Sequence, residues 1–416
     1  MTRNTLGLLL LLLLTSCIDR IDLGDDVADL YRQQLYIEGR IMSGANSVFY
    51  VQRTIPMSQN NRNYVEDAEL RIVSDQGFVS DAATLTEDHA YVIPTGTLND
   101  TEHYKLVAAI DGETYESDYL TLQPSLPIDS VWFTEHPREH LGYNIWTKNH
   151  IDIHVAAHGD EHQARHYMWT WEEDYEFHAP YDISSPIDGY HLIYSPDIWL
   201  DVVPGVKNPY YYCWKHGEST DYNLYSTENL AQNVVSDVVV ASFGKDSQSY
   251  GGTIRDGLSP RFSYLYAITV HQSTLDSTAY SYYRQMEQYT EEMGGLFSPT
   301  PYDLYGNLHC TSHPEVRVRG NVVASQVSNY RLFIDRKDVS LYVDYRPREP
   351  LRKNTAYTWP NANELRQLVE GGDVLGSLSP NNYAMAEAIF YRPCLDCRMS
   401  PGATKQKPAW WPNDDE

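Results

Sequence analysis

The chain has 416 residues, of which 42% are hydrophobic and 21% charged, so it is too apolar for a disordered protein and too long for one small domain. Lys and Arg number 31 against 57 Asp and Glu, which gives a formal net charge of -26. Because affinity for nucleic acid depends mainly on cationic contacts with phosphates, this balance argues against a nucleic-acid partner. The 34 Tyr, 22 Pro and 24 Gly residues are typical of β-sandwiches rather than helical bundles.

The N-terminus has the pattern of a lipoprotein signal peptide over residues 1–16. A basic start precedes a leucine run, Leu8 to Leu14, that is far shorter than the roughly 20 apolar residues of a membrane-spanning helix. Residues 14–17, Leu-Thr-Ser-Cys, resemble a bacterial lipobox, which predicts cleavage before Cys17 and attachment of diacylglycerol and a further acyl chain such as palmitate. Several acyl chains anchor a protein more firmly than one. The alternative is an ordinary secreted protein in which Cys17 is incidental.

An acidic segment, residues 17–33, follows the predicted lipidated cysteine and contains Asp19, Asp22, Asp25 and Asp26. It resembles the export signal that sends some Bacteroidota lipoproteins to the outer face of the outer membrane. The alternative is a solvated linker that is acidic by chance. No later segment is apolar enough to span a bilayer, so we expect a soluble body tethered to the outer membrane. If the acidic segment acts as an export signal, this body lies on the extracellular face.

Four cysteines remain in the predicted mature chain: Cys213, Cys310, Cys394 and Cys397. In an oxidising compartment an even set of this kind predicts disulfides, and four cysteines allow three connectivities, between which the sequence does not choose. Cys394 and Cys397 form a C-x-x-C pair. The partner ligands of a zinc site and the α/β context of a redox motif are both missing, so a structural disulfide is the expected role.

Residues 34–124 have the pattern of an immunoglobulin-like β-sandwich. Short alternating segments occur at residues 35–42, 47–52, 68–73, 91–93, 104–110 and 113–122. Asp111-Gly112 separates the last two, which is a strong signal for a tight hairpin. A proline-containing stretch ending at Pro127 then supplies a linker, since proline stiffens the chain and removes a hydrogen-bond donor.

Residues 128–416 are expected to form a larger β-rich domain, or two such domains. Strands are predicted at residues 128–134, 151–155, 167–172, 210–214, 316–319, 322–324 and 330–334, with a loop over about 179–209. The one long helix is predicted from an apolar stripe running from Leu275 to Met293, with Asp276 as its N-cap and Gly294-Gly295 after its end. A second, short helix is predicted over residues 361–370. The predicted fold class is therefore mainly β, with one long and one or two short helices.

Histidines recur every four residues at 150, 154, 158, 162 and 166. Ile151, Ile153 and Val155 alternate with polar residues, so we expect a strand whose histidines face solvent. Residues 158–162, His-Gly-Asp-Glu-His, match the H-x-x-E-H string of some zinc proteases, but that chemistry needs a helix and the glycine argues against one. We therefore expect surface histidines with adventitious metal affinity, and no metal or other cofactor.

Trp169 and Trp171 lie two residues apart and therefore on one face of their strand. With Trp214 they are candidate ligand-stacking residues, although the same alternation more often builds the core of a sandwich. The neighbouring acids Glu172, Glu173 and Asp174 are a weak candidate for an acid and base pair. The sequence contains no G-x-S-x-G, Walker or dinucleotide-binding motif, so it assigns no catalytic residue and favours a protein that is not an enzyme.

These features together resemble the domain-of-unknown-function 4249 family of Bacteroidota lipoproteins, over essentially the whole mature chain. The resemblance is carried by the lipidated cysteine with its acidic tether and by short motifs in a fixed order. They are residues 36–39 (Tyr-Ile-Glu-Gly), 127–130 (Pro-Ile-Asp-Ser), 169–172 (Trp-Thr-Trp-Glu), 212–214 (Tyr-Cys-Trp), 306–310 (Gly-Asn-Leu-His-Cys), and a closing segment with Cys394, Asp396, Cys397, Arg398, Gly402 and 407–410. The family pattern usually has paired glycines where this chain has Pro401-Gly402.

The resemblance implies an outer-membrane lipoprotein, and genes of family members often lie beside those of TonB-dependent transporters. It implies no catalytic residues. We therefore expect an accessory protein that captures an unidentified extracellular ligand or docks on such a transporter. The alternatives are a structural scaffold of an envelope complex without a small-molecule ligand, and a surface hydrolase that uses Glu172, Glu173 or Asp174.

Overall fold

Strands account for most of the structure, as the sequence predicts. The computed structural model of the protein describes residues 34–54, 63–142, 145–146, 148–161, 163–179, 185–194, 197–202, 209–219, 222–244, 248–250, 253–255, 258–292, 304, 306–343, 376–377 and 396–412. The predicted signal peptide, Cys17, the acidic tether, Cys394 and the predicted helix at 361–370 lie outside these residues. Among the described residues, no helix has the length and apolar character needed to cross a bilayer.

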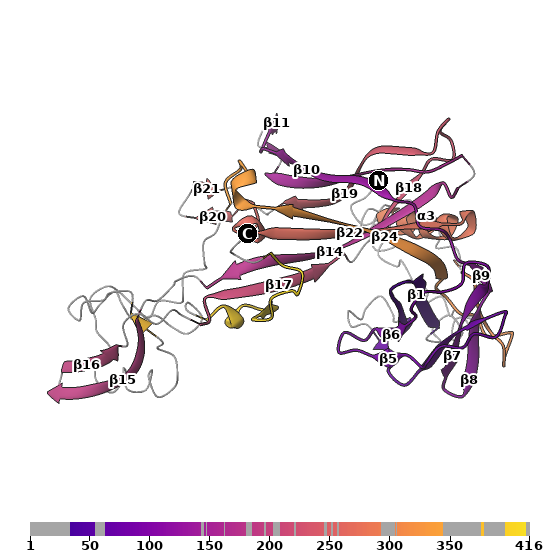
Figure 1. The fold of residues 1–416 in the computed structure, drawn as a ribbon, viewed down its shortest axis with the longest axis horizontal. Helices are drawn as coiled ribbons and strands as arrows, with labels where there is room; N and C mark the ends of the chain where they lie inside the picture. The colour runs from indigo at the N-terminus through magenta and orange to yellow at the C-terminus, as the bar shows by residue number, and fades with distance from the viewer. Residues whose placement is uncertain are drawn as a thin grey trace, which may run out of the picture.

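The elements follow one another along the chain in the order shown in Figure 1. The strands that precede the linker are β1 (Leu35–Ser43), β2 (Asn46–Arg53), β3 (Asn63–Tyr64), β4 (Glu69–Ser74), β5 (Thr84–Leu85), β6 (Tyr91–Pro94), β7 (His103–Ile110), β8 (Glu113–Ser117) and β9 (Leu120–Thr121). They are followed by β10 (Ile128–His136), β11 (His140–Gly142), β12 (Ile145–Trp146), β13 (His150–His158), β14 (His166–His178), β15 (Ser185–Tyr194), β16 (Asp197–Val202), β17 (Tyr212–Glu218), β18 (Asn223–Ser226), β19 (Val234–Gly244), β20 (Gln248–Tyr250), β21 (Thr253–Arg255), β22 (Tyr266–Leu275), β23 (Leu308–Cys310), β24 (Val322–Ile334), β25 (Gly376–Ser377) and β26 (Ala403–Thr404). The helices among the described residues are α3 (Ser277–Glu292) and three 3-10 turns, η1 (Pro260–Phe262), η2 (Arg336–Asp338) and η4 (Cys397–Met399).

The N-terminal part is a sandwich of two sheets. Strands β1, β2, β6 and β5 face the sheet β23-β8-β7-β4, and alternate residues such as Ile37, Phe49 and Leu106 are fully buried between them. The turn between β7 and β8 has positive φ at Asp111 (54°) and Gly112 (83°), as a type I′ hairpin requires. The predicted hairpin is therefore confirmed.

This first sandwich takes residues from far along the chain. Strand β23 pairs with β8, and the core includes Leu308, Cys310 and Val322, which the sequence assigned to the second domain. Gly306 and Gly320 lie back to back at this return, since a Cβ on Gly306 would lie 2.0 Å from the Gly320 carbonyl oxygen. Gly320 has φ of +100°, and its own Cβ would lie 1.9 Å from the Ile37 oxygen. Only glycine fits this close approach.

A second sandwich forms from β26-β17-β14-β22-β24 on one side and β10-β13-β19 on the other. Its core contains Ile151, Ile153 and Val155 from β13, all fully buried, together with Tyr167 and Val270. Residues 151–155 therefore alternate as predicted, with His150 and His154 on the outer side of the strand. The prediction that the histidines face solvent is wrong for His154, which Trp132 covers, and for His166, because both are buried. His158 is the last residue of β13, and residues 159–161 are not helical, so this part of the H-x-x-E-H string does not lie on a helix. His162 is outside the described residues.

Strand β24 belongs to both sandwiches. Residues 322–326 pair in parallel with β1, and residues 327–334 pair antiparallel with β22. The two sheets therefore join into one eleven-stranded sheet, which runs through the middle of the molecule in Figure 1. Val322 is buried in the first core and Ile334 in the second.

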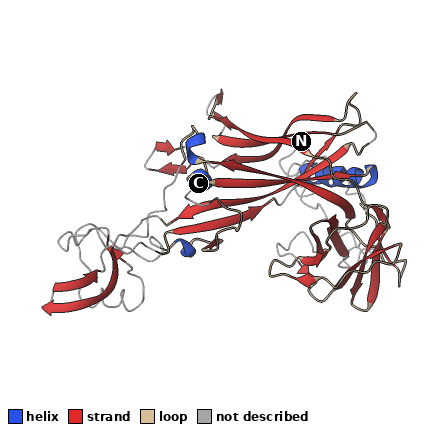
Figure 2. Ribbon diagram, viewed as in Figure 1, coloured by secondary structure: helices blue, strands red, loops and turns tan. Residues whose placement is uncertain are grey.

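The helix α3 covers the junction of the two sandwiches and is the long helix in Figure 2. Its N-cap is Asp276, whose carboxylate accepts a hydrogen bond of 2.8 Å from the Ala279 backbone N–H, as predicted. Tyr282 and Tyr283 are buried against the sheet, beside Glu38 of β1. Burial, reinforced by the Glu38 charge, raises the pKa of Tyr282 to about 12, so this hydroxyl remains neutral.

The segment predicted as a loop over residues 179–209 contains a hairpin instead, so this prediction is wrong. Strands β15 and β16 pair antiparallel, and β25 adds to the other edge of β15. The hairpin projects from the end of the molecule opposite the first sandwich (Figure 1). Pro186 lies at the start of β15, where a missing backbone donor is tolerated.

Candidate functional site

Trp169 is a core residue, so its candidate role in stacking on a ligand is wrong. Its side chain is fully buried and stacks on Tyr167, with ring centroids 5.6 Å apart. The indole N–H donates to Gln272 Oε1 at 2.9 Å, and the Gln272 amide donates in turn to the Leu126 carbonyl. Indole, amide and backbone are therefore fixed together between the two sheets.

The other two candidate tryptophans do not form a platform with it. Trp171 points to the same core and meets Phe243 edge to face, with centroids 5.2 Å apart. Trp214 pairs with Glu176 of β14, which places it on the opposite face of the sheet from Trp169 and Trp171. The structure does not bring the three indoles together.

The three consecutive acids are divided between the two faces of β14. Glu173 points into the core, where its carboxylate accepts a hydrogen bond of 2.6 Å from Arg261. Burial raises the pKa of Glu173, and the Arg261 charge only partly offsets this effect. Glu172 and Asp174 lie on the opposite face of β14 from Glu173, but only Glu172 is well exposed, since the Asp174 side chain is 12% exposed.

Around Glu172 and Asp174 the outer face of the sheet carries a set of polar and charged side chains. Paired residues on adjacent strands share a face, which brings together side chains from β14, β17, β22 and β24. We call this set the charged strip: Glu172, Asp174, His216, Glu218, His271, Asn329 and Arg331. The sequence analysis named only the two acids of β14, because the other members come from strands far apart in the chain.

Imidazoles accompany both carboxylates of β14. His216 Nδ1 lies 3.1 Å from Asp174 Oδ1, and His271 Nε2 lies 3.9 Å from Glu172 Oε2. The hydrogen bond that His216 donates to the Asp174 carboxylate raises the pKa of His216, so this histidine holds its proton to a higher pH than usual. The side chains of His216 and Glu172 are 54% and 37% exposed, so both are accessible to a binding partner.

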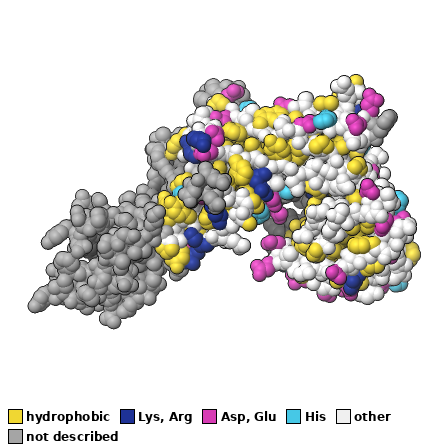
Figure 3. Space-filling view, in the orientation of Figure 1, with side chains coloured by type: hydrophobic (Ala, Val, Ile, Leu, Met, Phe, Trp, Pro, Cys, Tyr) yellow, Lys and Arg dark blue, Asp and Glu magenta, His cyan; other side chains and the backbone are white. Residues whose placement is uncertain are grey.

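The charged strip ends at a contact with the first sandwich on one side and at a cluster of aromatic residues on the other. At one end Arg40 of β1 donates to Thr170 Oγ1 at 3.3 Å, which links the strip to the first sandwich. At the other end the Arg331 guanidinium lies 3.6 Å from the centre of the Trp410 ring, and Trp410 and Trp411 pack on Phe333. Figure 3 shows that acidic side chains are spread over the visible face of the molecule, with Lys and Arg in only a few places.

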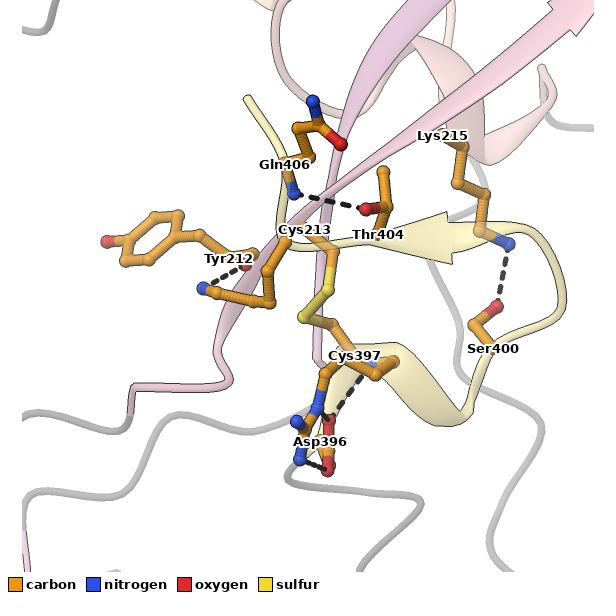
Figure 4. The surroundings of a disulfide bond; sticks show 10 residues. Tyr212, Cys213, Lys215, Asp396, Cys397, Ser400, Thr404 and Gln406 are labelled. Atoms are coloured by element: carbon orange, nitrogen blue, oxygen red, sulfur yellow. Dashed lines mark hydrogen bonds and ion pairs between the residues drawn. A yellow bond between two sulfur atoms is a disulfide. The ribbon is translucent and has the colours of Figure 1, made fainter. Parts of the chain in front are cut away.

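The C-terminal segment is attached by a disulfide between Cys213 and Cys397, with Cα atoms 5.8 Å apart (Figure 4). Strand β26 adds to the edge of β17, and Lys405 donates to the Tyr212 carbonyl. Lys215 donates to Ser400 Oγ at 2.6 Å, and burial lowers the pKa of its ammonium group.

The cysteines therefore follow the prediction only in part. A disulfide is confirmed, but it joins Cys397 to Cys213 rather than to the nearby Cys394. Cys310 is a buried free thiol in the first core, so the prediction that it is disulfide-bonded is wrong. The motif residue Asp396 accepts hydrogen bonds from the Arg398 backbone and guanidinium, which makes it a cap of η4.

The charged strip combines one like-charged pair with side chains that are held by hydrogen bonds. Glu172 and Glu218 lie directly opposite each other on adjacent strands, an arrangement of like charges that favours a cationic partner. Arg331 Nε already donates to Thr269 Oγ1 at 3.0 Å, and His271 pairs with Asn329 at 2.7 Å. These contacts hold the side chains in place on a rigid sheet, as a recognition surface requires.

Comparison with known proteins places the chain in a family. A family model described as Domain of unknown function (DUF4249) matches residues 20–331, which include the first sandwich, every member of the charged strip, and the second sandwich except for the end of β24, β26 and the residues that follow β24. No curated protein matches the chain. Two motif positions of the resemblance have structural causes here: a Cβ on Gly39 would lie 2.3 Å from the Phe49 ring, and Gly306 abuts Gly320. The chain belongs to the DUF4249 family.

Proposed function

We propose that this protein is an outer-membrane lipoprotein, anchored through Cys17 at the cell surface, that docks on a TonB-dependent transporter as an accessory protein. The observation that carries the proposal is the charged strip on the shared sheet, in which the side chains of His216 and Glu172 are 54% and 37% exposed. The predicted tryptophan platform does not form, because Trp169 is buried and Trp214 lies on the other face of the sheet. The lipobox and the acidic tether support the anchoring, and the disulfide between Cys213 and Cys397 fits an oxidising compartment outside the cytoplasm.

The electrostatics of the strip indicate how docking would occur. The paired carboxylates Glu172 and Glu218 and the net charge of -26 favour a basic surface on the partner, because complementary charge raises association rates and selects the partner. A hydrolase that needs all three acids of residues 172–174 is not proposed, since Glu173 faces the core.

The test is a purification of the full lipidated chain, tagged at its C-terminus, from its native outer membrane in a gentle detergent, with mass spectrometry of the proteins that remain bound. We expect stoichiometric recovery of a TonB-dependent barrel. Recovery of the lipoprotein alone, where known barrel complexes survive the same detergent, would refute docking.

A pair of matched variants assigns the surface. Glu172→Lys with Glu218→Lys reverses the strip, and Asp81→Lys with Glu87→Lys makes the same change in charge on exposed loops of the first sandwich. The strip variant should lose the barrel and the loop variant should keep it. Equal recovery with both variants would favour the scaffold alternative, in which another surface holds the complex together.

A further inference from the structure

The outer face of the β10–β13–β19 sheet brings three metal-binding side chains together. His136 at the end of β10 lies directly opposite His150 at the start of β13, and Asp152 lies two residues further on the same face. Asp152 Oδ2 is 3.3 Å from His136 Nε2 and 3.8 Å from His150 Nε2. One donor atom of each residue lies within 4.8 Å of the others.

The hydrogen bond of His150 determines which of its nitrogens is free. Its Nδ1 lies 2.9 Å from the Lys148 carbonyl oxygen, which can only accept, so Nδ1 carries the proton. In the neutral ring Nε2 therefore presents a lone pair toward the Asp152 carboxylate. A backbone carbonyl on the distal nitrogen is the usual way in which a metal-binding histidine is oriented.

Asp152 has one carboxylate oxygen beside the two imidazoles and one oxygen without a hydrogen bond to any described residue. Its side chain is only 15% exposed, and its Oδ1 is buried with no hydrogen-bond partner among the described residues. A buried carboxylate oxygen without a donor is costly, and two lone pairs that face each other repel. A cation between Asp152 and the two imidazoles removes both penalties.

The Thr134 hydroxyl lies between His136 and His154. Thr134 Oγ1 lies 2.9 Å from His136 Nε2 and 2.7 Å from His154 Nε2, and His154 Nδ1 lies 2.6 Å from Asp237 Oδ1. The order hydroxyl, imidazole, carboxylate is that of a catalytic triad. Here, however, the hydroxyl also contacts His136, and the His154 ring is covered by Trp132. Thr134 contacts the same His136 nitrogen that faces Asp152, so a metal ion bound at this nitrogen would replace the hydrogen bond to Thr134.

We propose that His136, His150 and Asp152 bind one divalent transition-metal ion of the zinc class, with solvent in the remaining position. Two imidazole nitrogens and one carboxylate oxygen are a donor set that zinc accepts, whereas calcium and magnesium prefer oxygen alone. The two rings are stacked, with centroids 4.7 Å apart and planes 12° from parallel, so each must turn for its lone pair to point at the same ion. The site is on a different sheet from the charged strip and does not depend on the proposed function.

The test uses the full chain, purified in detergent with a tag that contains no histidine and treated with a chelator. Calorimetric titration with Zn²⁺ should show one saturable equivalent, and Co²⁺ should give the visible absorption of a four-coordinate site. His136→Gln and His150→Gln should each weaken Zn²⁺ binding by about 10- to 100-fold or more. His158→Gln is the matched control, because His158 is on the same strand, 62% exposed, and bonded to Asp129.

Three results would overturn the proposal: no saturable equivalent in the unmodified chain, unchanged affinity in both cluster variants, or an equal loss in the His158 control. Urea unfolding of each variant without metal shows whether it is folded. If His150→Gln does not fold, Zn²⁺ affinity is measured in Asp152→Asn, which removes the charge with almost no change in shape. Unchanged affinity in that variant would overturn the proposal.

Discussion

Replacement of Trp169 by alanine is the sharpest test of the core assignment. The side chain is fully buried, and Trp→Ala changes at such positions cost about 3–5 kcal/mol of unfolding free energy. The substitution also leaves Gln272 Oε1 without the indole donor, and an unsatisfied buried acceptor costs about 1–3 kcal/mol. We therefore expect a loss at or above the upper end of the first range, measured by urea unfolding followed by circular dichroism.

Two further variants separate the contributions. Trp169→Phe keeps an aromatic ring but removes the indole N–H, so it should cost about 1–3 kcal/mol, mainly from Gln272. Trp214→Ala, on the other face of the sheet and only partly buried, should cost less than Trp169→Ala. A loss below about 1 kcal/mol for Trp169→Ala, or a larger loss for Trp214→Ala, would refute the reasoning.

Three other predictions follow from named contacts. Removal of the disulfide by Cys213→Ala with Cys397→Ala should lower the unfolding free energy by about 2–5 kcal/mol, because the bond closes a loop with a sequence separation of 184; urea unfolding with and without reductant checks this. Gly320→Ala should destabilise the fold by about 1–3 kcal/mol or more, since φ of +100° and the Ile37 oxygen exclude a Cβ; a melting curve unchanged from that of the original chain would contradict it. The raised pKa of His216 means that its contact with Asp174 contributes fully below the ordinary histidine pKa of about 6.5 and is lost as pH rises through the higher folded value. His216→Gln should therefore destabilise the protein more at about pH 6 than at about pH 8, and an equal effect at both would count against the pairing.

Local signals predicted local structure well. Asp111-Gly112 predicted its hairpin because both residues tolerate positive φ, and Asp276 predicted the helix start because its side chain caps a free N–H. The apolar alternation at residues 151–155 predicted the buried face of β13. In each case the information lies within a few neighbouring residues.

Features that depend on distant pairing were not predictable in this way. The parallel contact of β1 with β24 joins segments about 280 residues apart, and nothing in either strand specifies its partner. The charged strip has the same origin, since His216, His271 and Arg331 become neighbours only when three strands pair with β14 or β22. The alternation of Trp169 and Trp171 placed both on one face but did not say whether that face was covered.

The shared strand β24 has a mechanical consequence. Strand β1 begins at Leu35, and it is held along one edge by β2 and along the other by residues 322–326 of β24. A pull on the N-terminal end of β1, as from a membrane anchor, would load these hydrogen bonds along the strand axis, so that many must break at once. Because β24 continues into the second sandwich, the same force would pass directly to β22. Tension at the N-terminal end of β1 would therefore be borne by both sandwiches together.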